Sequence, residues 1–93
     1  MADVKISISN GKISVDKNKV TIAAGSERVT FKADGQFGIV MPSGHPNPVI
    51  SPKGGGGKWE GQVGPFPEGS GTLKYDVTAP GAETLDPDIE ILP

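Results

Sequence analysis

The sequence predicts an all-β protein built as a sandwich of short strands. Apolar and polar residues alternate with a period of two along most of the chain, as they do in strands with one buried face. Turn signals separate the alternating runs at the short intervals typical of sandwiches and barrels. No run places apolar residues at helical spacing. We therefore expect two sheets with seven or eight strands, in a single domain that spans residues 1–93.

The first alternating run ends in a tight turn. Val4, Ile6 and Ile8 alternate with polar residues, and Asn10–Gly11 follows them directly. An Asn-Gly pair between two such runs is the strongest short signal of a β-hairpin, because both residues tolerate positive φ angles. The run at 13–15 should therefore return antiparallel to the first.

Five more runs repeat the alternation, and Gly25 and Asp34–Gly35 mark turns between the earlier ones. These runs lie at residues 20–22, 29–31, 39–41, 73–77 and 89–91. Their inward members should form the core. The predicted core residues are Ile6, Ile8, Ile13, Val15, Val20, Ile22, Val29, Phe31, Ile39, Leu73, Tyr75, Val77, Ile89 and Ile91.

Composition excludes several classes of function. A net charge of -2 gives no reason to expect binding to nucleic acid or to an acidic membrane surface. The absence of cysteine excludes disulfides and thiolate metal sites. No apolar run could span a bilayer, and the first residues lack the apolar segment of a signal peptide. We expect a periplasmic or extracellular protein if a leader was removed, and a cytoplasmic protein otherwise.

Two long segments resemble a known family. ISNGKISVDKNKVTIAAGSERVTFKADGQFGIVM is similar to the first half of a plastocyanin-type cupredoxin, with its hairpin, its V-x-I-x-x-G strand and its V-x-F strand. GSGTLKYDVTAPGAETLDPDIEI is similar to the family's penultimate strand, ligand loop and closing strand. The resemblance implies a Greek-key β-sandwich of two sheets.

The copper ligands that this resemblance implies are missing. Phe37 stands where the family has a histidine, and Val77 stands in the place of its cysteine. The segment from Thr78 to Leu85 contains neither histidine nor methionine. A type-1 copper centre needs a thiolate and two imidazoles, so we expect no copper, no other metal site and no cofactor. Phe37 and Val77 should instead fill the end of the sandwich where copper would sit.

The loop PSGHPNPVISPKGGGGK, residues 42–58, holds the only histidine of the chain. His45 lacks a nucleophile-elbow serine nearby, so we do not expect an enzyme. The run GGGGK fails the phosphate-binding pattern, because Pro52 occupies the place of its first glycine and Trp59 that of its Ser/Thr. We interpret the segment as a loop first and a binding loop second.

Three further features have two readings each. Trp59 could stack on a sugar ring or fill the core, and we favour the core. Asp86, Asp88 and Glu90 share one face of a predicted strand, which fits a solvated face better than a calcium site. Basic residues concentrate in the first half, but strands from both halves mix in a sandwich, so this asymmetry need not form a basic patch.

The sequence therefore favours a copper-free, non-catalytic module that binds another protein, or itself, through loops at one end of the sandwich. That end should have an apolar centre and a polar rim formed by His45, Lys58 and Glu83. An alternative is a carbohydrate- or small-ligand-binding module that uses Trp59 and the 42–58 loop, and a third reading is a weak metal protein or enzyme centred on His45. The candidate binding residues are Phe37, His45, Lys58, Trp59, Pro80 and Leu85.

Overall fold

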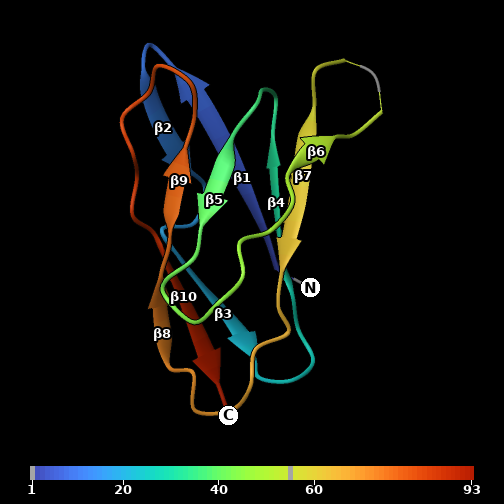
Figure 1. Ribbon diagram of the computed structural model, residues 1–93, viewed down its shortest axis with the longest axis vertical. Coiled ribbons are helices and arrows are strands. Elements are labelled where there is room, and N and C mark those ends of the chain that lie inside the picture. The colour runs from blue at the N-terminus through green and yellow to red at the C-terminus, as the bar shows by residue number, and fades with distance from the viewer. Residues whose placement is uncertain (1, 55) are drawn as a thin grey trace.

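The computed structural model describes residues 2–54 and 56–93. Within these residues all regular structure is β-strand, and no helix is present. Ten strands form a five-stranded, a three-stranded and a two-stranded sheet in a body of 37 × 26 × 22 Å (Figure 1). The predicted all-β class is confirmed, and the arrangement is consistent with a β-sandwich. The strands are β1 Ala2–Ser9, β2 Lys12–Val15, β3 Lys19–Ala23, β4 Val29–Ala33, β5 Gly38–Val40, β6 Ser51–Pro52, β7 Trp59–Val63, β8 Thr72–Lys74, β9 Asp76–Thr78 and β10 Asp88–Leu92.

The five-stranded sheet has the order β2-β1-β4-β7-β6. β1 and β2 form the predicted antiparallel hairpin, and Asn10 and Gly11 in its turn have φ angles of 53° and 74°. β4 occupies the centre of the sheet, parallel to β1 and antiparallel to β7. Ile6, Ala33 and Trp59 consequently lie in one row across the three strands.

The other two sheets have the orders β3-β10-β8 and β5-β9. The predicted run at 73–77 divides at Tyr75, because β8 pairs with β10 whereas β9 pairs with β5. The Tyr75 amide donates to the Pro87 carbonyl at 3.1 Å instead of continuing either ladder. This division, the strand β7 and the two-residue strand β6 bring the number of strands in the described residues to ten, so the predicted seven or eight was too low.

The core contains most of the predicted residues and some that the sequence did not indicate. Phe31 of β4 is fully buried, and its ring lies 5.2 Å from that of Tyr75, which joins the two layers. Two expected members are wrong: Val15 is half-buried, and Ile8 is 36% exposed. Ile8 lies beside the hairpin turn, at the open end of the sandwich. The buried apolar residues outside the predicted set are Val4, Ala33, Phe37, Met41, Val63 and Phe66.

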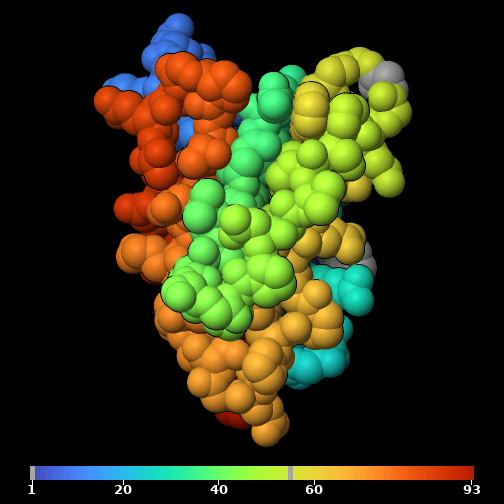
Figure 2. Space-filling view, in the orientation of Figure 1, coloured from blue at the N-terminus to red at the C-terminus, as the bar shows by residue number. Residues whose placement is uncertain are grey.

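The segment between β5 and β6 lies across one face of the molecule (Figure 2). It reaches Gly61 of β7, where a Cβ atom would overlap Ile50 Cδ1 and lie 3.0 Å from the Val49 carbonyl oxygen. Glycine at this position therefore allows the crossing segment to sit directly on the sheet. The amide of Met41 donates to Asn47 Oδ1 at 2.7 Å, which closes the first part of the segment on itself.

We predict that Phe31→Ala lowers the free energy of unfolding by about 3–5 kcal/mol, because it removes a fully buried ring from the contact between the layers. Urea denaturation followed by tryptophan fluorescence measures this loss. A decrease below about 1 kcal/mol would contradict the central position of Phe31.

We predict that Gly61→Ala destabilises the protein by about 1–3 kcal/mol, because the new methyl group forces the segment at Val49 and Ile50 away from β7. Gly35→Ala is the matched control, since a Cβ atom there meets no atom within 4 Å. Its effect should stay below about 0.5 kcal/mol in the same urea titration. Equal effects of the two substitutions would show that the close approach at Gly61 is not limiting.

Candidate functional site

The two ends of the sandwich differ in what they contain. We call one the hairpin end, defined by residues 8–11, 34–36, 58 and 79–83. There the Glu83 amide donates to the Gly11 carbonyl at 3.0 Å. We call the other the terminal end, defined by residues 24–28, 64–66 and 92. There the amides of Ala24 and Gly25 donate to the carbonyls of Leu92 and Phe66.

His45 lies at the terminal end. Its ring is 5.7 Å from that of Phe66, in an edge-on arrangement. β5 runs antiparallel to β9 and so carries the chain away from the hairpin end before it reaches His45. The prediction that His45 forms a rim with Lys58 and Glu83 is therefore wrong. The order of strands, which the loop sequence does not encode, decides this.

The other predicted binding residues at the hairpin end differ in how much of their side chains is exposed. Phe37 is only 5% exposed, so it fills the sandwich but offers no contact surface. Leu85 is half-buried, and it exchanges two backbone hydrogen bonds with Val77, at 2.8 and 3.1 Å. Pro80 is exposed and lines a hollow. Among these three residues, Pro80 is the most exposed, Leu85 is partly accessible, and Phe37 is buried.

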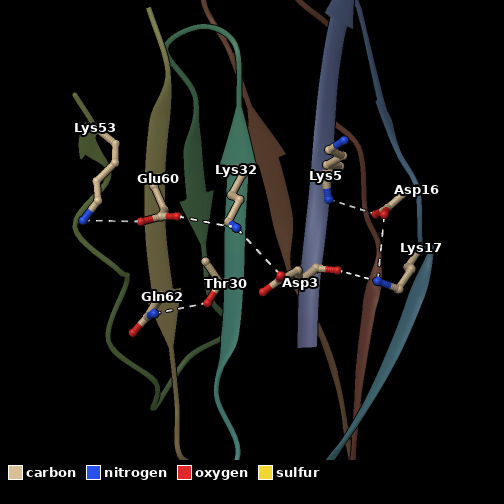
Figure 3. A network of polar contacts seen from close by, with 9 residues as sticks. All are labelled: Asp3, Lys5, Asp16, Lys17, Thr30, Lys32, Lys53, Glu60 and Gln62. Carbon is tan, nitrogen blue, oxygen red and sulfur yellow. Dashed lines mark hydrogen bonds and ion pairs between the residues drawn. The ribbon is translucent and has the colours of Figure 1, made fainter. Parts of the chain in front are cut away.

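The first hollow at this end, which we call the lysine hollow, lies on the outer face of the five-stranded sheet and has a volume of about 380 Å³. It crosses β1, β4 and the start of β7. In Figure 3, Lys5, Lys32 and Glu60 are seen on these three strands. The lining residues are Lys5, Ile6, Ser7, Lys32, Ala33, Asp34, Lys53, Lys58, Trp59 and Glu60.

The Trp59 ring does not face this hollow. Residues directly opposite on neighbouring strands share a face, and Trp59 lies opposite Ala33, which lies opposite Ile6. Ile6 and Ala33 are buried in the core, and Trp59 packs against that core. The three side chains thus point away from the lysines. The favoured reading of Trp59 as a core residue agrees with this geometry.

Ion pairs occupy part of the lysine hollow. Lys32 Nζ lies 3.7 Å from Asp3 and 4.0 Å from Glu60, and Lys53 Nζ lies 3.8 Å from the other oxygen of Glu60 (Figure 3). Lys5 and Lys58 also line the hollow, and neither ammonium group has an acidic partner among the described residues. The hollow thus contains two ammonium groups that form no ion pair within the part of the chain that the structure describes.

The second hollow, which we call the Ile8 hollow, adjoins the first and measures about 410 Å³. The two share Ile6, Ser7 and Asp34 as lining residues. The Ile8 hollow lies between the end of β1 and the loops that follow β4 and β9. Its lining residues are Ile6, Ser7, Ile8, Asp34, Gly35, Gln36, Ala79 and Pro80.

The carboxylates of β10 are paired with lysines of its neighbours. Asp88 lies 3.4 Å from Lys74 of β8, and Glu90 lies 3.3 Å from Lys19 of β3. This pairing fits the predicted solvated face. Asp76 and Asp86 interact with each other, and the hydrogen bond between their side chains raises the pKa of Asp76 above its usual range. No group of three or more His, Cys, Asp or Glu side chains within the described residues could hold a metal ion.

The sequence did not reveal that Lys5, Lys32 and Lys53 lie close together. Lys5 and Lys32 occupy outward positions of two strands that are far apart in the sequence, and the parallel register of β1 and β4 places them directly opposite. Alternation alone predicts that both face solvent, but not that they are neighbours. Lys53 joins them because β6 pairs with β7 beside Glu60.

No known protein family matches the chain, and no curated protein matches it. Among solved structures, the fold is similar to part of the endo-fucoidan hydrolase MfFcnA9 from glycoside hydrolase family 107, with a TM-score of 0.52 and 15% sequence identity. The similarity covers 90% of this chain and 16% of the hydrolase chain. At this identity it concerns the fold alone. Within the described residues, no helix is long and apolar enough to cross a membrane.

Proposed function

We propose that this chain is a copper-free, non-catalytic module with a cupredoxin-like, two-sheet Greek-key sandwich, and that it binds another protein through its hairpin end. The observation that carries the proposal is the pair of adjoining hollows at this end. Loops on a rigid sandwich commonly carry recognition while the strands carry stability.

The composition of the Ile8 hollow supports a protein partner. Ile8 is exposed although its neighbours Val4 and Ile6 in the same alternation are buried, so the strand presents an apolar side chain where the sandwich opens. Pro80 adds a second exposed apolar surface from the loop after β9. Apolar side chains surrounded by polar ones, here Ser7 and Gln36, are the usual arrangement at the centre of a protein interface.

The positions of residues 2 and 92 also support the hairpin end as the binding surface. The Ala2 amide donates to the Arg28 carbonyl, and the Leu92 carbonyl accepts from Ala24, so residues 2 and 92 both lie at the terminal end. Figure 1 shows the start of β1 and the end of β10 in the lower half, away from the hairpin turn and the loop after β9 at the top. A polypeptide attached at either end would leave the hairpin end accessible.

A carbohydrate or small ligand is the second candidate for this surface. The volume of the lysine hollow is in the range of small-molecule sites, and the structurally similar protein is an endo-fucoidan hydrolase of glycoside hydrolase family 107. Against it, the Trp59 ring packs against the core, and His45 of the 42–58 loop lies at the other end. An enzyme centred on His45 has less support, because its ring packs on Phe66 away from both hollows.

We predict that linear peptides selected from a random phage-displayed library bind the hairpin end. Their addition to the ¹⁵N-labelled protein should shift amide resonances of residues 7–10, 34–36 and 79–83. Ile8→Glu should weaken this binding about tenfold or more, because it places a charge in the apolar part of the surface.

Val49→Glu is the matched control, since Val49 is an apolar residue that is 84% exposed and lines neither hollow. It should leave the affinity unchanged. The proposal is rejected if selection yields no binder, or if the resonance shifts cluster at the terminal end. Sedimentation velocity of the unliganded protein tests self-association, and a dimer abolished by Ile8→Glu would identify a second copy as the partner.

A further inference from the structure

The lysine hollow differs in charge from the molecule as a whole. The chain has a net charge of -2, yet the hollow is lined by Lys5, Lys32, Lys53 and Lys58 against only Asp34 and Glu60. A concave surface lined mostly by one sign of charge attracts ligands of the opposite sign. The ligand that complements this hollow is therefore anionic.

The lysines are also arranged unfavourably for the protein alone. Lys5 lies directly opposite Lys32 in the parallel pairing of β1 and β4. Like charges directly opposite on neighbouring strands are destabilising. Asp3 and Glu60 form ion pairs with Lys32, whereas no carboxylate of the described residues forms one with the ammonium group of Lys5. Lys58 stands on the far side of β4, before β7, and is also unpaired within the described part of the chain.

An incoming carboxylate would relieve this repulsion. The hollow offers it two unpaired ammonium groups, so binding does not require an existing ion pair to break. Charge complementarity at partly exposed sites mainly sets the rate and specificity of binding, and it weakens with salt.

The adjoining Ile8 hollow adds a second requirement on the ligand. Ile6, Ser7 and Asp34 belong to both hollows, so one extended segment can contact both at once. Such a segment would place an aliphatic side chain against Ile8 and Pro80 and its carboxylates beside Lys5 and Lys58. Asp34 lies where the hollows meet, so the ligand should be uncharged at that point.

We propose that the partner presents a linear acidic peptide segment, with at least one aliphatic residue next to its carboxylates, which lies across both hollows. This inference rests on the proposed function and names the chemistry of the partner. A polypeptide fits better than an anionic polysaccharide. Sugar rings are usually bound by stacking on aromatic rings, and Trp59, the aromatic residue of the lysine hollow, turns its ring to the core.

The selected peptides provide the test. Sequences recovered from the random library on the wild-type protein should be enriched in Asp and Glu together with Leu, Ile or Val. Fluorescence anisotropy measures the affinity of the protein for labelled selected peptides. The double variant Lys5→Glu/Lys58→Glu should lower this affinity about tenfold or more, and the affinity of the wild-type protein should fall as the NaCl concentration rises. The double variant Lys5→Ala/Lys58→Ala should also lower the affinity for these peptides, but by a smaller factor.

The control is Lys12→Glu. Lys12 lies on β2, outside both hollows, and has no acidic partner among the described residues. The Lys12→Glu variant changes the charge at one site by the same amount as each lysine-to-glutamate substitution in the hollow. It should alter the affinity for the selected peptides by less than about threefold. Thermal unfolding of each variant verifies that it folds. If Lys5→Glu/Lys58→Glu fails to fold and Lys5→Ala/Lys58→Ala folds, the affinity of the Ala double variant for the selected peptides decides whether the two lysines contribute to binding.

Two outcomes overturn the inference. Neutral or basic peptides that bind at Ile8 and ignore the double lysine variants would leave the proposed function intact and refute an acidic partner. Heparin binding that depends on Lys5 and Lys58, without enrichment of acidic peptides, would assign the lysine hollow to an anionic polysaccharide instead. Failure to select any peptide would refute the proposed function itself.

Discussion

The contact between Phe31 and Tyr75 is the interaction on which the arrangement of the layers depends. Phe31 lies in the middle strand of the five-stranded sheet, and Tyr75 lies between the two short strands of the opposite layer. Both are almost completely buried, and their rings meet at 5.2 Å in a tilted geometry. Large aromatic side chains contribute more buried apolar area than any others, so this pair anchors a small core.

This anchor fixes which face of β4 is outward. Because Phe31 points into the core, Thr30 and Lys32 must point the other way. Thr30 is nevertheless buried and accepts a hydrogen bond from Gln62 Nε2 at 3.1 Å, whereas Lys32 is exposed and lies between Asp3 and Glu60 (Figure 3). The polar outer face is therefore a consequence of the apolar inner one. Exposed ion pairs of this kind contribute little to stability.

The Ile8 hollow arises at the end of the sandwich, where the two layers no longer cover each other. β1 extends three residues past its last buried position, Ile6, and its residue Ile8 is exposed beside Pro80 of the loop after β9. At the terminal end, the ring of Phe66 is buried and His45 packs against it. Each end thus contains a buried aromatic ring, Phe37 at the hairpin end and Phe66 at the terminal end, and the ends differ in that the hairpin end leaves Ile8 exposed.

The sequence by itself determined the class of fold, the hairpin at Asn10–Gly11 and the inward face of most strands. These features depend on alternation and on turn residues, which are local. It could not determine that His45 lies at the end away from Pro80, since that depends on the path of a long loop. It could not place Lys5 opposite Lys32 either, because parallel pairing joins strands that are distant in the chain. The two hollows exist only once register and loop paths are set, so tertiary structure alone decided the candidate site.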